Sequence, residues 1–369
     1  MAKIPLAFLW ENLGATLKKE KDWEMPSLFK DFASECEAVR KGVGILDLSC
    51  RGKIEVTGKD RVSFLHRVLS QDIQTLGLGA GAYAALLNAQ GRILADMNVF
   101  VFANRILLDT EVGLEKKIIA ALEKLHVTED VELGDATGRW ILISLQGPKT
   151  EALLAALIHG SVVVNREFYH TNFTLLDTPA TLIRRSVTGE KGFHLLIPKE
   201  NGEPIVKRIL EVGKPYGIRP VGSGAFEILR IEAGIPRYGI DMDETVTLPE
   251  TGLEGIVASE AKGCYPGQEV VARIKTYGGL NRRLSGLLFD KSYLPRTGDK
   301  VTKDGQEIGF VTSACHSPTL GKGVAFAYLQ KGNFSDGLEV SIVSAPPIPA
   351  RTTPLPFISP HPEGPRGLS

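Results

Sequence analysis

The chain has 369 residues, of which 43% are hydrophobic and 23% are charged, so it is long enough for two or three domains with ordinary buried cores. Its 43 basic and 43 acidic residues balance, and this neutral charge argues against a nucleic-acid or anionic-membrane partner. The four cysteines are widely spaced and form no Cys-x-x-Cys pair, which argues against a metal site and favours a reducing cytoplasm. No apolar run approaches the ~20 residues of a membrane span, so a soluble protein is expected. It is also expected to be cytoplasmic and monomeric.

The N-terminal segment predicts a scaffold of short strands and helices. A helix is expected over 29–40, followed by a short apolar run at 43–49, a strand at 53–56 and an amphipathic helix over 60–69. No chemistry is assigned to these elements. The glycine-rich segment 77–82 fits a dinucleotide fingerprint, but no strand precedes it, so a plain loop is expected instead.

Two β-hairpins are expected next. In the first, strands at 83–87 and 93–99 flank a turn at 88–91, and the second follows at 99–108. Asp96 interrupts the otherwise apolar second strand. A carboxylate in such a strand must either face water or have its hydrogen bonds satisfied inside the protein, and the residues alone leave both possibilities open.

The middle of the chain contributes two further charged segments. Glu190 lies in a turn at 188–192, where a solvated Glu-Lys pair is the simplest interpretation. Arg230 and Glu232 lie on a predicted helix over 225–233, where an exposed charged face is the simplest interpretation. Neither segment carries a functional signal by itself.

The sequence Lys-Gly-Cys-Tyr-Pro-Gly-Gln-Glu at 262–269 places a cysteine in a setting that suggests chemistry. Its glycines and its proline predict a shaped loop rather than the interior of a helix. Lys262 lies two residues before Cys264, and a nearby cation favours the nucleophilic thiolate form of a cysteine. The alternative is a buried cysteine that acts as a small hydrophobe in a tight turn.

Beyond residue 283 the sequence changes to short strands separated by turns, a pattern typical of a small antiparallel barrel or sandwich. The Pro/Gly-rich stretch beyond residue 346 is expected to form a flexible tail, apart from residues 355–357. The strands of this last third are expected at 284–289, 301–302, 307–312, 324–328 and 339–343.

Taken together, these motifs resemble a known family. The 262–269 loop meets every fixed position of K-G-C-[YF]-x-G-Q-E, the signature of the YgfZ proteins, which are folate-binding relatives of the glycine-cleavage T-protein (aminomethyltransferase). The resemblance extends over roughly residues 42–357, which is most of the chain. Other segments that are similar to T-protein motifs include 44–49, 83–99, 145–148, 188–194, 225–234 and 317–323.

The resemblance implies an α+β fold with three lobes. Two interleaved mixed α/β lobes would surround a central folate cleft, and a C-terminal antiparallel β-barrel would close one side. The expected ranges are 1–140 for one mixed lobe, 141–283 for a second lobe that ends in the cysteine loop, 284–345 for the barrel and 346–369 for the tail.

The resemblance also implies a binding site for tetrahydrofolate or a one-carbon derivative of it. Tyr83 matches the folate-site tyrosine of the family, and Asp96 matches an aspartate near the reacting nitrogen of folate, where it could hold or shuttle a proton. Glu190 would accept hydrogen bonds from the pterin ring, because a carboxylate can accept two parallel N–H groups. Arg230 would contact the folate tail or the pterin side.

Cys264, with Lys262 beside it, would act as a reactive thiol at or near this cleft. The primary hypothesis is therefore a tetrahydrofolate-binding accessory factor for the assembly or repair of iron–sulfur cluster proteins, with cluster-assembly proteins or client enzymes as partners. The alternative is a folate-dependent aminomethyltransferase, which the retained Asp96 supports. The cysteine loop opposes this alternative, as does Ala95, which replaces the first aspartate of a pair in the T-protein motif. A folate-binding scaffold without enzymatic activity is the third hypothesis.

Overall fold

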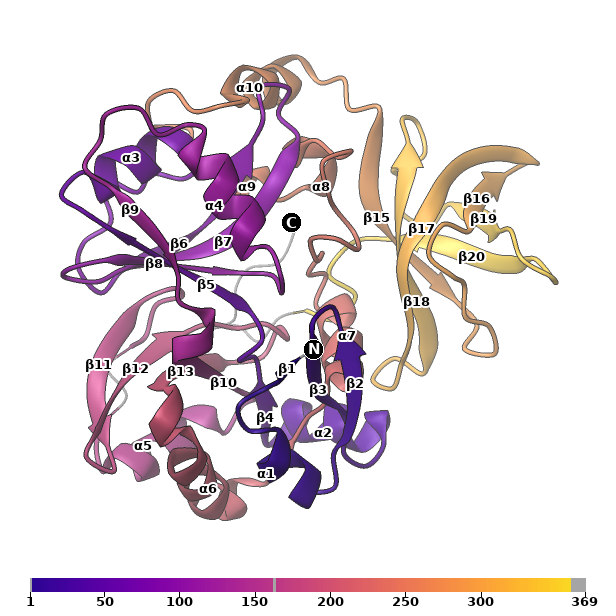
Figure 1. Cartoon of the computed structure of the whole chain (residues 1–369). Coiled ribbons are helices and arrows are strands. Elements are labelled where there is room, and N and C mark those ends of the chain that lie inside the picture. The colour runs from indigo at the N-terminus through magenta and orange to yellow at the C-terminus, as the bar shows by residue number, and fades with distance from the viewer. Residues whose placement is uncertain (1, 162–163, 360–369) are drawn as a thin grey trace.

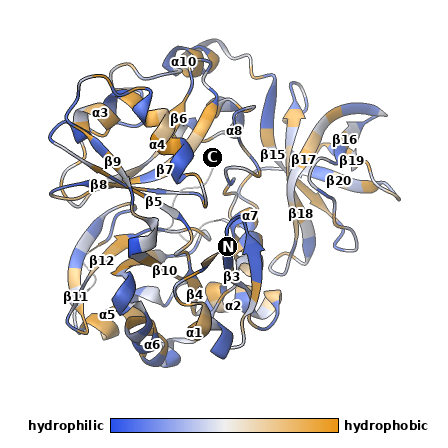
Figure 2. Ribbon diagram, viewed as in Figure 1, coloured by the Kyte–Doolittle hydropathy of each residue, from blue (hydrophilic) through white to orange (hydrophobic). Residues whose placement is uncertain are grey.

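The structure, a computed structural model, describes residues 2–161 and 164–359. It consists of two mixed α/β lobes, one above the other in Figure 1, and a closed β-barrel that lies beside them. Hydrophobic residues concentrate on inner strands such as β10 and β12 (Figure 2). This arrangement confirms the predicted α+β fold with three lobes. None of the described helices combines the length and apolar character needed to cross a membrane.

The upper lobe is built on a five-stranded antiparallel sheet with the order β6-β7-β8-β5-β9. Two helices, α3 (Arg61–Val68) and α4 (Glu115–Glu123), contribute buried side chains to the same hydrophobic core. Along the strand of 93–101, alternate residues enter that core, whereas Asp96 and Asn98 share the other face. The strands are β5 (Gly52–Thr57), β6 (Gly81–Leu87), β7 (Ile93–Val101), β8 (Ile106–Thr110) and β9 (Glu132–Asp135).

The lower lobe contains a six-stranded sheet with the order β11-β12-β13-β10-β4-β14. Strand β4 precedes the whole upper lobe in the sequence but pairs with β10 and β14 of the lower sheet, so the two lobes are interleaved as predicted. The strands are β4 (Val43–Asp47), β10 (Trp140–Gln146), β11 (His170–Leu175), β12 (Thr178–Arg184), β13 (Gly192–Pro198) and β14 (Ile218–Pro220). The helices of this region are α2 (Phe32–Lys41), α5 (Thr150–Ile158), α6 (Gly202–Val212) and α7 (Ser223–Glu232).

Helix α7 lies centrally, because it contacts α2, the N-terminal sheet and the barrel. The N-terminal sheet has the order β1-β3-β2, and helix α1 (Ala7–Asn12) belongs to the same segment. Its strands are β1 (Ala2–Lys3), β2 (Thr16–Glu20) and β3 (Trp23–Leu28). Between α7 and the barrel the chain forms α8 (Leu248–Thr251), α9 (Glu254–Val257) and α10 (Gln268–Tyr277).

The barrel is closed in the order β15-β18-β17-β16-β19-β20, and all its strand pairs are antiparallel. The predicted C-terminal antiparallel barrel is therefore confirmed. Its interior is a separate hydrophobic core of mostly aliphatic side chains. The strands are β15 (Arg282–Phe289), β16 (Lys300–Lys303), β17 (Gln306–Ser317), β18 (Lys322–Gln330), β19 (Glu339–Ile342) and β20 (Ile348–Thr353).

Strand β20 lies in the stretch that the sequence predicts to be a flexible tail. It pairs with β15 on one side and β19 on the other, and so closes the barrel. Ile348, Ala350 and Thr352 alternate toward the interior and are buried. Prolines at three of the positions 346–349 concealed this alternation. The rest of the predicted tail, residues 360–369, lies outside the described residues.

Candidate functional site

A narrow cavity lies where both lobes and α7 meet. Its volume is about 60 Å³. The charged side chains that line it are Arg51, Asp96, Glu111, Arg185, Arg230 and Arg237. So many charges around one small space make this cavity the strongest candidate for a functional site.

Tyr83 and Asp96 form a hydrogen-bonded pair in this cavity. The two residues come from the paired strands β6 and β7, and the Tyr83 hydroxyl donates to Oδ2 of Asp96 over 2.6 Å. The other carboxylate oxygen of Asp96, Oδ1, is buried and has no hydrogen-bond partner among the described residues. Burial raises the pKa of Asp96 to about 6. Asp96 can therefore change its protonation state near neutral pH.

A second group of charges surrounds this pair and is internally neutralised. Arg51 donates to Asp109 and Glu111, and Arg237 donates to Glu111 as well. Burial alone would raise the pKa of Glu111, but Arg51 and Arg237 lower it to about 2. These side chains remain ionised over the physiological range and hold the shape of the cavity wall.

Arg230 lines the cavity, but its guanidinium is already engaged. It is 1% exposed, and it donates to Asp241, to Glu227 and, over 2.7 Å, to the hydroxyl of Ser313 in the barrel. The predicted exposed face of this helix is therefore buried instead, because the barrel packs against it. Arg230 connects α7 to the barrel, and its predicted contact with folate stays a prediction.

Glu190 does not line the cavity. Its carboxylate accepts a hydrogen bond of 2.8 Å from Arg40, which also donates to the fully buried Glu232 over 2.6 Å. This network joins the 188–192 turn to α2 and α7. The predicted contact of Glu190 with a pterin ring stays a prediction.

Lys262 and Cys264 do not line the cavity either. The Lys262 ammonium donates to the backbone carbonyls of His66, Leu69 and Gln71, at the C-terminal end of α3. A cation there complements the carbonyl end of a helix. Burial lowers the pKa of Lys262 to about 8. The lysine therefore anchors the cysteine loop to the upper lobe.

Cys264 itself is exposed, whereas the other three cysteines are buried. Burial raises the pKa of the Cys36 and Cys50 thiols to about 12, so both remain protonated thiols. Cys264 is thus the cysteine available to react with an external partner. Of the six predicted site residues, the structure brings Tyr83, Asp96 and Arg230 together in one cavity.

Comparison with known proteins agrees with the fold. Residues 7–261 match the family model described as GCVT N-terminal domain, and residues 282–358 match the Glycine cleavage T-protein C-terminal barrel domain. The chain belongs to the glycine-cleavage T-protein family. The predicted superfamily is therefore confirmed, whereas these matches do not distinguish its YgfZ branch.

Two curated relatives of this T-protein family member are named aminomethyltransferase. The protein from Caldanaerobacter subterraneus subsp. tengcongensis is 32% identical over 346 residues, 93% of this chain and 92% of the relative. The protein from Bacillus subtilis is 31% identical over 344 residues, 93% of this chain and 94% of the relative. A crystal structure of glycine cleavage system aminomethyltransferase T from Bartonella henselae has a TM-score of 0.88 at 26% identity, and the match covers 98% of this chain and 99% of that one. These names favour the alternative hypothesis over the primary one.

Asn98, His194 and Arg185 are among the cavity residues to which the sequence analysis assigned no role. Asn98 lies two positions after Asp96 on the same face of β7, a period-of-two signal that the sequence did contain. His194 is a polar residue in the apolar strand β13, where burial lowers its pKa to about 3 and keeps the imidazole neutral. Arg185 follows β12, and its guanidinium lies 5.8 Å from the ring centroid of Tyr83. No local pattern marked this arginine.

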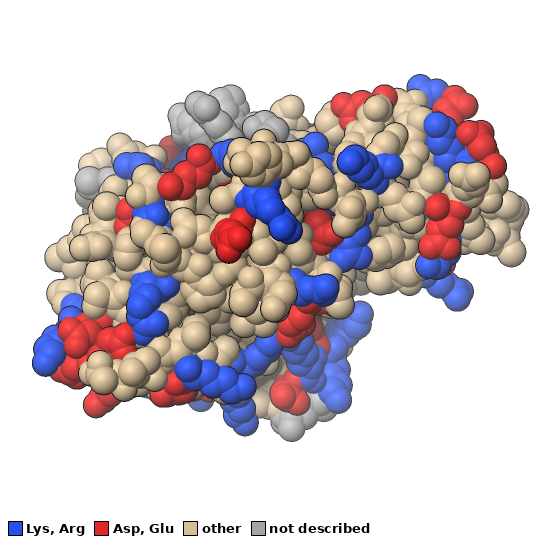
Figure 3. Space-filling view, turned by 90° about the horizontal axis from the view of Figure 1, so that it is seen from above, with Lys and Arg blue, Asp and Glu red and all other residues tan. Residues whose placement is uncertain are grey.

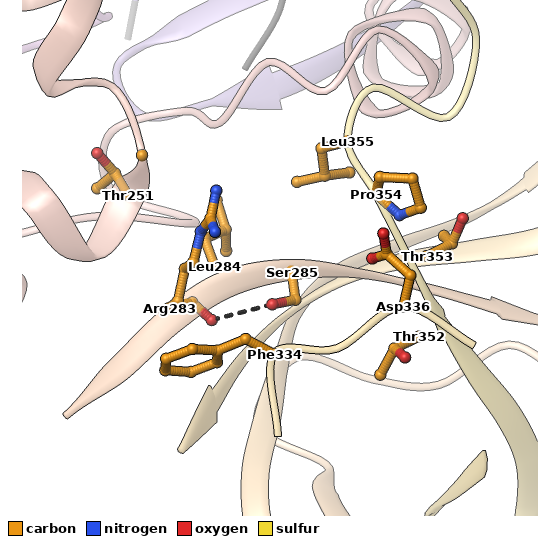
Figure 4. A pocket seen from close by; sticks show the side chains of 11 residues that line it. Thr251, Arg283, Leu284, Ser285, Phe334, Asp336, Thr352, Thr353, Pro354 and Leu355 are labelled. Atoms are coloured by element: carbon orange, nitrogen blue, oxygen red, sulfur yellow. Dashed lines mark hydrogen bonds between the residues drawn. The ribbon is translucent and has the colours of Figure 1, made fainter. Parts of the chain in front are cut away.

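A second hollow, of about 210 Å³, lies between α8, β15, the loop before β19 and the end of β20. Figure 4 shows that Arg283 and Asp336 point toward it. Both side chains belong to exposed residues, and no buried unpartnered polar atom of the described chain lies on this hollow. On the face seen from above, acidic and basic side chains are interspersed (Figure 3). Neither feature competes with the Asp96 cavity as a functional site.

Proposed function

We propose that this protein is a tetrahydrofolate-dependent aminomethyltransferase that uses the Asp96 cavity. The observation that carries the proposal is the buried carboxylate of Asp96, with one oxygen bonded to Tyr83 and the other unpartnered in the cavity. Aminomethyltransferases use tetrahydrofolate, in agreement with the predicted cofactor. An unpartnered buried acceptor fits a ligand rich in N–H groups, because a satisfied hydrogen bond removes the penalty of its burial.

Bound tetrahydrofolate supplies nitrogen atoms that accept the one-carbon unit. Asp96 can receive or donate a proton at Oδ1 beside the ligand, because its pKa of about 6 lies close to the operating pH. Tyr83 fixes the carboxylate by its hydrogen bond to Oδ2. The pairs of Arg51 and Arg237 with Glu111 keep that wall of the cavity rigid and ionised.

Two aromatic rings beside the cavity offer a surface for a flat ligand. The guanidinium of Arg185 lies over the rings of both Tyr83 and Phe168, at 5.8 Å and 4.8 Å from their centroids. These two rings are nearly parallel, with an interplanar angle of 15°. A flat ligand could replace the guanidinium by stacking on the same aromatic surfaces.

Two measurements test the proposal. Tetrahydrofolate should raise the melting temperature of the protein, since a ligand that binds only the folded state stabilises it. The protein should also form methylenetetrahydrofolate from an aminomethyl-lipoyl carrier, and Asp96→Asn should slow this turnover by 10²–10⁴-fold. Glu190→Gln tests the predicted pterin contact apart from the network with Arg40, because its carboxamide oxygen can still accept a hydrogen bond from Arg40. An absent melting shift and absent turnover in the wild type would refute the proposal.

The exposed position of Cys264 favours a second candidate, the accessory role in iron–sulfur protein assembly or repair. The loop carries every fixed residue of the YgfZ signature, and Lys262 anchors it so that the thiol lies at the surface. This role predicts that Cys264→Ala fails to rescue a strain that lacks the protein under oxidative stress, although the variant still binds tetrahydrofolate. Cys36→Ala serves as the matched control, because that thiol is buried. Full rescue by Cys264→Ala would exclude this candidate and leave the aminomethyltransferase.

A further inference from the structure

Asn98 projects into the same cavity as Asp96 but has no part in the function proposed so far. It lies two positions further along β7, so both side chains share one face of the strand. The residue is only 4% exposed, and it lines the cavity. Its carboxamide oxygen, Oδ1, has no hydrogen-bond partner among the described residues.

The orientation of this amide follows from its neighbour. The Nδ2 group of Asn98 donates to Oδ2 of Asp109 over 2.7 Å. Burial opposes the ionisation of Asp109, but Arg51 outweighs it and holds the pKa of that carboxyl below its usual range. An ionised carboxylate can only accept hydrogen bonds, so the amide must present its NH₂ group to Asp109. The oxygen of Asn98 is therefore fixed as an acceptor.

Asp96 and Asn98 each carry an unpartnered oxygen, and both residues lie on the same face of β7. Residues at positions i and i+2 of a strand are about 7 Å apart along the backbone. One ring-shaped ligand in the cavity could therefore donate N–H groups to both acceptors. A water molecule could satisfy Oδ1 of Asn98 equally well, and the experiment below distinguishes it from a ligand contact.

We propose that Asn98 is a specificity-determining residue that accepts an N–H of the reduced ring of the ligand, with Asp96 as the acceptor on the other side. The ligand class is a reduced nitrogen heterocycle that carries free N–H groups. The proposal rests on tetrahydrofolate binding in the Asp96 cavity and adds the means by which reduced and oxidised forms are told apart. Folic acid has the same aminopyrimidine but lacks the N–H groups of the reduced ring, so it cannot make this contact.

The test compares the dissociation constants of tetrahydrofolate and folic acid, measured by calorimetry under anaerobic conditions. In Asn98→Ala the affinity for tetrahydrofolate should fall about 3- to 10-fold, the effect of one hydrogen bond, while the affinity for folic acid changes less than twofold. The preference for the reduced form should fall by the same factor. Asn172→Ala is the matched control, because Asn172 lies on β11, an edge strand of the lower sheet, and does not line the cavity.

The outcomes separate the two proposals. If the wild type binds tetrahydrofolate but the preference is unchanged in Asn98→Ala, or if both affinities fall equally, the role of Asn98 is refuted and the proposed function stands. If the wild type binds neither compound, both proposals fail. Asn98→Ser keeps a hydroxyl that can donate to Asp109 but removes the carboxamide oxygen, so it gives the same comparison if Asn98→Ala does not fold.

Discussion

The buried carboxylate of Asp96 should destabilise the folded protein wherever it is ionised, and Asp96→Asn should remove this cost. In the folded chain the pKa of Asp96 is about 6, against an ordinary value of 3.8. The folded state therefore binds more protons than the unfolded state between these two pH values, so the contribution of this group to stability is present at low pH and is lost as the pH rises through 6.

The magnitude follows from the difference between the two pKa values. A shift of one unit corresponds to about 1.4 kcal/mol, so the full shift amounts to about 3 kcal/mol, of which about 2.4 kcal/mol is recovered at pH 4. Asparagine has nearly the same shape, and its carbonyl can still accept the hydrogen bond from Tyr83. The gain in stability on Asp96→Asn should therefore be larger at pH 8 than at pH 4, by about 2 to 3 kcal/mol.

Urea unfolding of wild type and Asp96→Asn at both pH values measures this difference. Every other group titrates in both proteins, so their contributions cancel. A substitution effect that is equal at pH 8 and pH 4 would refute the assignment of a perturbed carboxylate to this cavity. It would also remove the argument that Asp96 can exchange a proton near neutral pH.

Three further predictions follow from the other contacts of the site. Tyr83→Phe should raise the pKa that governs the pH profile of turnover by about half a unit to one unit, because the hydrogen bond from Tyr83 stabilises the ionised form of Asp96 and the variant lacks it. An unchanged profile would show that Asp96 does not control it. Lys262→Met should lower the free energy of unfolding by about 1–2 kcal/mol, because the hydrogen bonds of the lysine to the end of α3 are lost. Between pH 8 and 10.5 the unfolded wild type binds more protons at Lys262 than the folded one, so the wild type should gain stability relative to the variant as the pH rises. A difference in urea unfolding free energy that does not change with pH would contradict this. Arg230→Met should cost about 3–5 kcal/mol, because it leaves Asp241 buried without its cation, and Asp241→Asn in the same chain should recover part of the loss in thermal unfolding.

Much of the architecture was predictable from the sequence, because periodicity and family motifs report on the backbone. Hydrophobic alternation located the strands on both sides of Asp96, and the loop signature at 262–269 pointed to the superfamily. The interleaved lobes were inferred from the resemblance, since β4 gives no local sign that its partner lies far downstream. Strand β20 was not predicted, because prolines interrupt the residues that alternate toward the barrel interior.

The site was less predictable, because it depends on which side chains meet across the lobes. Asp96 was ambiguous until the position of Tyr83 showed that it is buried and half-satisfied. Lys262 lies near Cys264 in the sequence, but its ammonium donates to backbone carbonyls at the end of α3 instead of contacting the thiol. Arg230 and Glu190 were identified by motif, yet their partners belong to distant segments that no local pattern reveals.

The position of β20 has a consequence for synthesis on the ribosome. Both β15 and β19 present unpaired backbone edges until the final strand emerges, and such edges invite pairing between neighbouring nascent chains. Just beyond β20, Phe357 stacks on Phe326, and the backbone amide of Ile358 donates to the carbonyl of Glu232. This last segment therefore also connects the barrel to α7. A premature stop near residue 346 would therefore yield an aggregation-prone fragment, even though the residues of the Asp96 cavity all lie upstream of it.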